Sequence, residues 1–101
     1  VITCGDLSLD TAAYELSCGK NSLKLGLKEF SIMELLMKNS GRVLSKETLI
    51  TKIWGYDSDA EYNNVEVYIS FLRKKLDFIK SKAAIKTVRG VGYTLEEDGA
   101  V

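Results

Sequence analysis

The sequence predicts an α+β fold, and the spacing of apolar residues in three stretches carries that prediction. Between residues 2 and 25, apolar and polar residues mostly alternate, as in short strands. Between residues 26 and 78 the apolar residues recur at helical spacing, and from 85 to 95 the alternation returns. We therefore expect an N-terminal antiparallel sheet (1–25), three helices (26–78) and a C-terminal β-hairpin (85–95).

The chain of 101 residues has the length and composition of one soluble globular domain. It contains no apolar run long enough to span a bilayer and no signal peptide, so we expect a cytoplasmic location and no membrane contact. It begins with Val1 rather than Met, which suggests a piece of a longer protein, although a processed terminus would look the same. The domain prediction is thus a single unit over residues 1–101.

The absence of histidine removes imidazole-based catalysis and the usual zinc sites. We expect no enzyme activity, no metal and no cofactor. In the first hairpin, pairing of Leu7 with Leu16 would place Cys18 opposite Gly5, with Cys4 on the other side of the sheet. We therefore expect Cys4 and Cys18 to be free thiols.

The first 25 residues predict three antiparallel strands joined by turns at 10–13 and 19–22. The residues expected to alternate on these strands are Leu7 and Leu9, then Tyr14, Leu16 and Cys18, then Leu23 and Leu25.

The first helix is predicted over residues 26–39, with Gly26 as its N-cap and Glu29 as the acid of its first turn. Ser45 is the predicted N-cap of the second helix. The expected core residues are Phe30, Met33, Leu36 and Met37 of the first helix, and Leu49, Ile50, Ile53 and Trp54 of the second.

The third helix, expected to begin at an Asn63 or Asn64 cap and to end near Phe78, has two apolar sides. At 100° per residue, its core stripe is Val65, Ile69, Leu72 and Leu76, and the opposite face carries Asn63, Val67, Ser70, Phe71 and Lys74. Such a face suits the DNA major groove, where thymine methyls favour apolar contacts and base edges favour donors. Alternatively, Val67 and Phe71 cover a second small core patch.

The formal net charge is zero, but the charges are unevenly distributed. Residues 67–90 contain one acid, Asp77, against seven bases: Arg73, Lys74, Lys75, Lys80, Lys82, Lys86 and Arg89. A polyanion would be attracted to this end of the domain, although a solvated helix end would show the same pattern.

A third helix followed by a basic hairpin is the arrangement of a winged helix-turn-helix. The chain resembles the OmpR/PhoB family of response-regulator effector domains over about 70 residues. The resemblance rests on LGLKEF at 25–30, GRVLSKETL at 41–49, IWGY at 53–56, NVEVYISFLRKKL at 64–76 and IKTVRGVGY at 85–93.

The resemblance implies the output domain of a two-component response regulator, which binds double-stranded promoter DNA sequence-specifically and regulates transcription. It implies tandem direct repeats as the DNA site, and RNA polymerase, a receiver domain and a cognate histidine kinase as partners. The receiver is absent from this chain, because the first 25 residues cannot build a phosphoacceptor pocket. A winged helix used only for protein interaction is the alternative, and the basic run beside Val67 and Phe71 favours DNA.

The resemblance also assigns residues. It makes 63–78 the recognition helix and 89–92 the wing tip. It places phosphate contacts at Trp54, Arg73 and Thr87, and Arg89 near the minor groove. The expected DNA-binding residues are Trp54, Asn63, Asn64, Glu66, Val67, Tyr68, Ser70, Phe71, Arg73, Lys74, Thr87 and Arg89. Ser70 and Phe71 stand where many relatives place Arg, which leaves the target sequence open.

The resemblance further implies a polymerase-contact loop between the second and third helices. Its residues are Gly55, Tyr56, Asp57, Ser58, Asp59, Ala60 and Glu61. A merely solvated acidic loop is the alternative interpretation.

Overall fold

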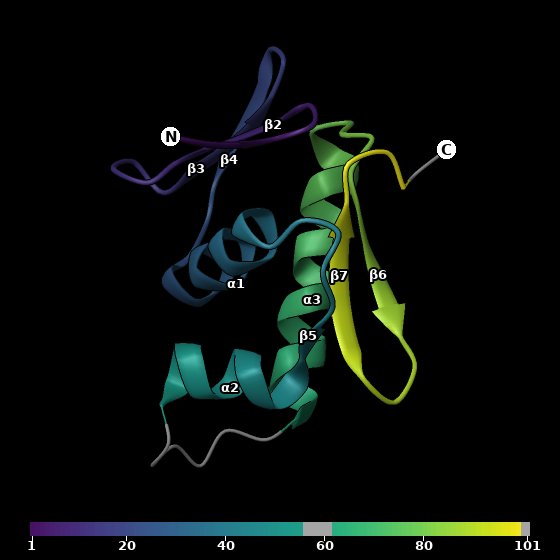
Figure 1. The fold of residues 1–101 in the computed structure, drawn as a ribbon. Helices are drawn as coiled ribbons and strands as arrows, with labels where there is room; N and C mark the ends of the chain where they lie inside the picture. The colour runs from purple at the N-terminus through teal and green to yellow at the C-terminus, as the bar shows by residue number, and fades with distance from the viewer. Residues whose placement is uncertain (56–61, 100–101) are drawn as a thin grey trace.

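The computed structural model describes residues 1–55 and 62–99 of the chain and confirms the α+β fold. Two antiparallel sheets and three helices follow one another in the predicted order (Figure 1). The first sheet has the order β1-β2-β3-β4 and the second the order β5-β7-β6. The elements are β1 Ile2–Cys4, β2 Leu7–Asp10, β3 Glu15–Cys18, β4 Asn21–Lys24, α1 Leu27–Lys38, β5 Leu44–Ser45, α2 Lys46–Trp54, α3 Tyr62–Phe78, β6 Ala84–Val88 and β7 Gly92–Glu96.

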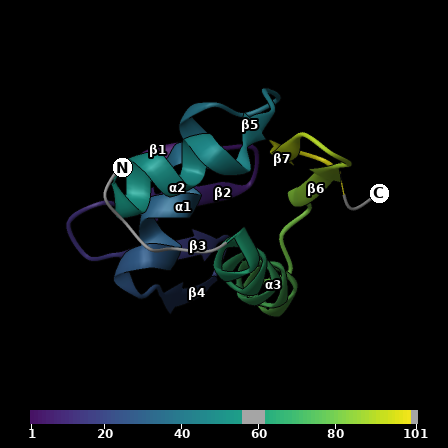
Figure 2. The same ribbon diagram turned by 90° about the horizontal axis from the view of Figure 1, so that it is seen from below.

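The helix α3 is the central element of the domain. It stands between α1 and α2 on one side and the β6–β7 hairpin on the other (Figure 1). Figure 2, seen from below, looks nearly along its axis and shows the hairpin beside it. The tip of the hairpin lies toward the end of the domain where α3 begins and where α2 lies. One end of the molecule thus presents a helix and a hairpin tip together.

The N-terminal sheet differs from its prediction, because it has four strands instead of three. The additional strand, β1, reaches β2 through a two-residue turn at Gly5 and Asp6, and Gly5 takes a positive φ of 58°. This conformation is accessible to glycine at little cost, so Gly5 permits the tight turn.

The register of β2 against β3 is also two residues away from the predicted one, because Leu7 pairs with Cys18 and not with Leu16. The Asp10 carboxylate accepts hydrogen bonds from the N–H groups of Ala12 and Ala13 at 2.9 and 3.1 Å, which fixes the turn one residue later than expected. Tyr14 therefore lies in the turn, with a φ of 55°, and not in a strand.

The prediction of two free cysteines is confirmed, but its geometric reason was wrong. Cys4 and Cys18 both pair with Leu7, one from each side, so their side chains share one face of the sheet. A whole strand separates them, which places their Cα atoms roughly 10 Å apart, beyond the reach of a disulfide.

The helix caps follow the sequence, except for that of α3. The Gly26 N–H donates to the Glu29 carboxylate at 2.9 Å, and the Thr48 N–H donates to the Ser45 hydroxyl at 3.0 Å. Because α3 already begins at Tyr62, Asn63 and Asn64 lie inside it and neither is its N-cap. The predicted end at Phe78 is confirmed.

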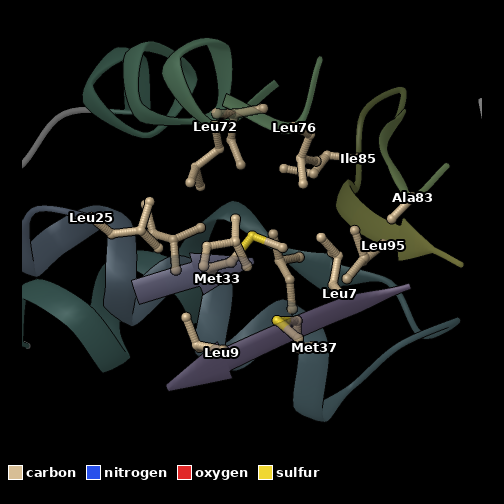
Figure 3. Packing of buried hydrophobic residues seen from close by; sticks show 14 of the residues in the cluster. Leu7, Leu9, Leu25, Met33, Met37, Leu72, Leu76, Ala83, Ile85 and Leu95 are labelled. Atoms are coloured by element: carbon tan, nitrogen blue, oxygen red, sulfur yellow. The ribbon is translucent and has the colours of Figure 1, made fainter. Parts of the chain in front are cut away.

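The core lies between the first sheet, α1 and the buried side of α3. Figure 3 shows Leu72 and Leu76 pointing toward Met33 of α1 and toward Leu7 and Leu95 of the two sheets. The predicted core residues of α1 are all buried, whereas in α2 only Leu49 is fully buried and Ile50, Ile53 and Trp54 are partly buried.

The short strand β5, which the sequence analysis missed, joins the start of α2 to the hairpin. Ser45 pairs with Gly92 of β7 and also caps α2. A Cβ atom on Gly92 would overlap the Leu44 carbonyl oxygen, at 1.9 Å. Gly92 is therefore required for close strand approach, while Gly90, with a φ of 77°, is the residue that turns the chain.

Candidate nucleic-acid interface

The helix α3 has one buried side and one exposed apolar side. The predicted core stripe is confirmed, since Val65, Ile69, Leu72 and Leu76 are buried. On the opposite side, Val67 is 49% exposed and Phe71 is 46% exposed. Ser70 and Lys74 beside them are exposed as well. Val67 and Phe71 therefore do not form a second core patch, and they remain available to a partner.

A row of aromatic rings connects α2 to this face. The ring of Trp54 lies 5.8 Å from that of Tyr68, which in turn meets the Phe71 ring edge-on at 6.5 Å. The Lys28 ammonium lies 5.3 Å from the centre of the Trp54 ring and donates to the Ile53 carbonyl at 3.2 Å. The partly buried Tyr68, which itself packs against Trp54, thus packs against the ring of Phe71.

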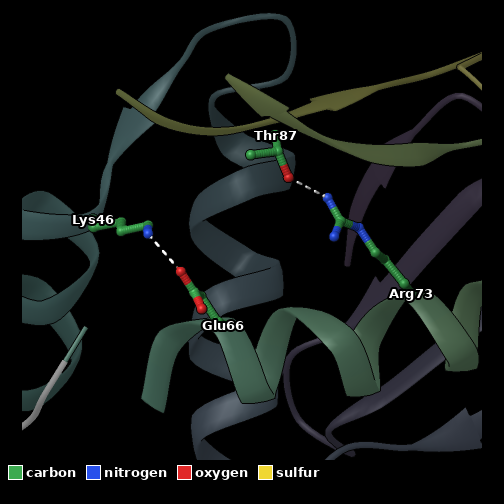
Figure 4. Close-up of polar contacts among 4 residues, drawn as sticks. All are labelled: Lys46, Glu66, Arg73 and Thr87. Atoms are coloured by element: carbon green, nitrogen blue, oxygen red, sulfur yellow. Dashed lines mark hydrogen bonds and ion pairs between the residues drawn. The ribbon is translucent and has the colours of Figure 1, made fainter. Parts of the chain in front are cut away.

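Two polar bridges fix α3 against its neighbours (Figure 4). The Lys46 ammonium at the start of α2 lies 2.7 Å from the Glu66 carboxylate. The Arg73 guanidinium donates to the Ile85 carbonyl and to the Thr87 hydroxyl of β6. These bridges hold the exposed face at fixed positions relative to α2 and the hairpin.

The hairpin tip is an exposed turn with a cation. Arg89, Gly90 and Val91 are exposed, and Val91 leaves 54% of its side chain accessible. An open groove separates this tip from the start of α2, and it is lined mainly by residues 45–47 and 87–92. Lys86, three residues before Arg89, adds a further exposed cation.

Tyr93 lies buried beneath the polar bridges. The Lys46 ammonium lies 6.0 Å from the centre of its ring. Burial is the main cause that raises the pKa of the Tyr93 hydroxyl, against the opposing effect of the positive charges of Lys46 and Arg73. A neutral tyrosine therefore supports the junction of α2, α3 and the hairpin.

Most of the predicted DNA-binding residues lie on the surface that α3 and the hairpin present. Those that are exposed are Asn64, Glu66, Val67, Ser70, Phe71, Lys74, Thr87 and Arg89. Trp54, Tyr68 and Arg73 are partly buried and contact other protein groups. The side chain of Asn63 lies outside the described residues.

Sequence reasoning missed Lys46, which shares this surface through its bridge to Glu66. The two residues are 20 positions apart and their pairing has no local signal, so only the tertiary structure reveals it.

Of the predicted polymerase-contact loop, the structure describes Gly55 alone. Gly55 ends α2 with a φ of 91°, and its N–H donates to the Ile50 and Thr51 carbonyls. Residues 56–61, which carry Asp57, Asp59 and Glu61, lie outside the described residues. The loop assignment therefore stays a prediction.

Among residues 1–55 and 62–99, no group of three or more Cys, Asp or Glu side chains is placed to hold a metal ion. No helix in the same part of the chain is both long and apolar enough to cross a membrane.

Comparison with known families identifies the chain. A family model described as "Transcriptional regulatory protein, C terminal" matches residues 19–95. The chain belongs to this family. The resemblance to OmpR/PhoB-type domains is thereby confirmed, and the family is one of DNA-binding domains of transcriptional regulators, not an enzyme family.

Relatives of this regulator domain agree in sequence and in fold. The transcriptional regulatory protein DltR of Streptococcus agalactiae is 47% identical over 93 residues, which are 92% of this chain and 42% of DltR. The C-terminal domain of the nisin resistance regulator NsrR superposes with a TM-score of 0.83 at 36% identity, over 97% of this chain and 98% of that one.

A further neighbour is the DNA-binding domain of Klebsiella pneumoniae RstA, solved in complex with the RstA box. Its TM-score is 0.78 at 28% identity, and the match covers 95% of this chain and 96% of the RstA domain. The fold is thus that of response-regulator DNA-binding domains, and the function of the domain is DNA binding in transcriptional regulation. This favours the DNA-binding interpretation over a winged helix used only for protein interaction.

Proposed function

We propose that this domain reads a promoter by placing the exposed face of α3 in the major groove and the hairpin tip near the adjacent minor groove. The observation that carries the proposal is the exposed pair Val67 and Phe71 on a helix whose opposite side is fully buried. Because Val67 and Phe71 are exposed on a helix that is held in place by its opposite side, they do not contribute to the core. They suit contact with thymine methyls at the floor of a major groove.

The polar groups around Val67 and Phe71 determine which base edges this face of α3 can contact. Ser70 and Asn64 supply neutral donors and acceptors, and Glu66 supplies a carboxylate of the kind that accepts from a cytosine amino group. Since Ser70 and Phe71 replace Arg at positions where many relatives carry it, the two-pronged contact of Arg with guanine is not available there. We therefore propose a site in which thymine contributes more of the specificity than guanine.

The hairpin and Lys74 supply the contacts that anchor the domain. Arg89 at the tip is exposed and lies where a cation gains most from the negative potential of a narrow minor groove. Trp54, Arg73 and Thr87 are proposed to contact phosphates beside the major groove, and Lys74 adds an exposed cation beside them. Contacts of this kind position the protein and make its affinity depend on salt.

We further propose that the domain acts as the output of a cytoplasmic two-component response regulator. The chain spans about two fifths of the length of the curated relatives that it matches. The remaining length leaves room for the proposed receiver domain, through which a histidine kinase would act. Tandem direct repeats in the promoter and a contact of residues 55–61 with RNA polymerase complete the proposal.

The proposal is tested by selecting bound sequences from random duplex DNA. We expect enrichment of a short motif containing thymine, and an affinity for that motif that falls steeply as salt rises from about 50 to 200 mM. Arg89→Ala is expected to weaken binding to all sequences, with an excess loss at A·T-rich flanks. No enrichment, or an affinity indifferent to salt, would contradict the proposal.

The polymerase contact has a test of its own. Replacing Asp57, Asp59 and Glu61 together by Ala is expected to leave affinity for the selected motif unchanged and to lower transcription from a promoter that contains it. Transcription at the wild-type level would end this part of the proposal and leave a solvated loop.

A further inference from the structure

Lys46 occupies the first position of α2, where a positive charge is electrostatically unfavourable. The first N–H groups of a helix carry a partial positive charge, so acidic side chains are favoured there and lysine is not. Ser45, directly before it, already caps the helix with its hydroxyl. The helix α2 alone therefore gives no reason for Lys46, and two of its partners lie in other elements.

These two partners hold the Lys46 ammonium between α3 and the hairpin. Nζ lies 2.7 Å from Oε1 of Glu66 (Figure 4) and 6.0 Å from the centre of the Tyr93 ring. Tyr93 is buried in β7, so its ring is a fixed surface for the cation. Lys46 leaves only 33% of its side chain exposed. The ammonium is thus confined to one place, and the Glu66 carboxylate bonded to it is confined as well.

Glu66 lies at the edge of the exposed face of α3. It stands one turn before Ser70 and, at 100° per residue, about 40° from it around the helix. Its side chain is 56% exposed although Oε1 is bonded to Lys46. Among the described residues, no hydrogen bond reaches the other oxygen, Oε2. The carboxylate therefore keeps one accepting oxygen available beside the face that carries Val67 and Ser70.

A carboxylate at such a face has a use and a cost. It can accept a hydrogen bond from the amino group of cytosine, which is exposed in the major groove. Its negative charge is repelled by the phosphates of both strands. An ammonium at 2.7 Å cancels that charge and leaves Oε2 able to accept. A side chain that is already held also loses less freedom when it binds.

We propose that Lys46 is a positioning residue that sets the base preference of Glu66. It cancels the charge of the carboxylate and holds it so that Oε2 accepts from the amino group of one cytosine. The inference rests on the proposed function, because it takes α3 as the element in the major groove. It gives the first residue of α2 a part in sequence specificity.

Selection from random duplex DNA with the wild type and with Glu66→Ala locates the base pair that Glu66 contacts. We expect one position of the motif to prefer C·G over T·A by roughly ten-fold in the wild type and to lose this preference in Glu66→Ala. The expected result for Lys46→Met is a similar loss of preference, together with weaker binding to a mixed-sequence duplex, because the carboxylate is then unneutralised. Lys46→Arg should keep the preference, since a guanidinium also binds a carboxylate.

The double variant Lys46→Met with Glu66→Ala separates this role from a direct phosphate contact by Lys46. If Lys46 acts through Glu66, the double variant has no less preference than Glu66→Ala and binds mixed-sequence duplex with the wild-type dependence on salt. A Lys46 that neutralises a phosphate itself predicts a slope of log affinity against log salt lowered by about 0.9 in the double variant. That result, with the C·G preference intact in Lys46→Met, would overturn the proposal.

The bridge also joins α2 to α3, so the variants need a readout that folding does not change. The preference is a ratio of two affinities measured on the same protein, and a partly unfolded sample lowers both affinities equally. The test thus holds where Lys46→Met is less stable. Lys38→Met is the matched control, because it breaks the pair of Lys38 with Glu34 within α1. It is expected to keep the wild-type preference and affinity.

The outcomes for this inference and for the proposed function are distinct. Failure of the wild-type domain to bind duplex DNA would contradict the proposed interface itself. Binding without any C·G preference that Glu66→Ala removes would refute the role of Lys46 and Glu66. In that case the proposed contacts of Val67 and Phe71 with thymine would be unaffected.

Discussion

The ammonium of Lys75 lies 2.6 Å from the carboxylate of Glu29, which ties α3 to the first turn of α1. The same carboxylate oxygen accepts the N–H of Gly26, so one oxygen joins the cap of α1 to α3. Glu29 is 11% and Lys75 is 30% exposed, which leaves the pair only partly accessible to water. α3 is therefore anchored through a short ionic contact in addition to its apolar stripe.

Glu29→Ala is expected to lower the free energy of unfolding by about 1.5–3 kcal/mol, because it leaves the Lys75 ammonium and the Gly26 N–H without their acceptor. Urea unfolding at neutral pH measures the loss. The exposed pair of Glu34 and Lys38, 3.6 Å apart on α1, is the matched control. Glu34→Ala should cost at most about 0.5 kcal/mol, and equal losses in the two variants would contradict the anchoring role.

Phe71→Ala is expected to separate DNA reading from folding. Since Phe71 is nearly half exposed, its truncation should lower the thermal midpoint only slightly. Its affinity for the selected motif should fall by about 1–3 kcal/mol, while binding to unrelated duplex changes little. Ile69→Ala, on the buried side of the same helix, is the comparison and should cost about 2–5 kcal/mol of stability. A large drop in midpoint for Phe71→Ala would make Phe71 structural.

Gly92→Ala is expected to destabilise the domain by about 3 kcal/mol, because the new methyl group would overlap the Leu44 backbone and push β5 away from β7. Gly90→Ala provides the contrast. Its Cβ atom would meet nothing within 4 Å, so only the positive φ costs energy, about 1 kcal/mol. Thermal unfolding of the two variants measures which of them is destabilised more. A larger loss in Gly90→Ala than in Gly92→Ala would show that β5 can move away from β7 at little cost.

Asp6 is expected to make folding stability depend on pH in the acid range. Burial raises its pKa, but hydrogen bonds from the Lys82 N–H (2.8 Å) and the Ser81 hydroxyl (2.6 Å), together with one from Cys18, outweigh burial and lower it below 3.8. A lowered folded pKa stabilises the protein above the ordinary pKa, and the contribution is lost as the pH falls through the folded value. The difference in stability between wild type and Asp6→Asn should therefore be constant near pH 7 and shrink progressively as the pH falls below about 4. A difference that stays constant across the whole range would rule out this linkage.

The helices and their buried faces were predictable from the sequence, because the spacing of apolar residues alone determines which side of a helix is buried. Val65, Ile69 and Leu72 illustrate this, and so does the cap at Ser45. The exposure of Phe71 was not predictable, since an apolar residue opposite the core stripe fits a groove or a second core equally well. Only the neighbouring elements decide between the two.

Strand pairing was the least predictable part of the fold. A register depends on the turn, and the Asp10 turn moved the predicted pairing of Leu7 by two residues while keeping its face. The Gly5-Asp6 turn was a local signal for β1 that the sequence analysis passed over. The strand β5 has only two residues and gives no signal of its own.

The interface contains contacts between residues distant in sequence, and periodicity does not encode these. The bridges from Lys46 to Glu66 and from Arg73 to Thr87 span 20 and 14 positions. The contacts of Arg73 with the Ile85 carbonyl of β6 were likewise not predictable from the sequence.

Ser45 belongs to two elements at once, because it pairs with Gly92 in the sheet of the wing and caps α2. The root of the wing and the start of α2 therefore cannot tilt independently. A duplex that contacts both α3 and the hairpin tip, as proposed, would thus meet two elements at a nearly fixed separation. DNA whose groove width or curvature differs from that separation has to deform to be bound, and the energy of that deformation depends on base steps that no side chain touches.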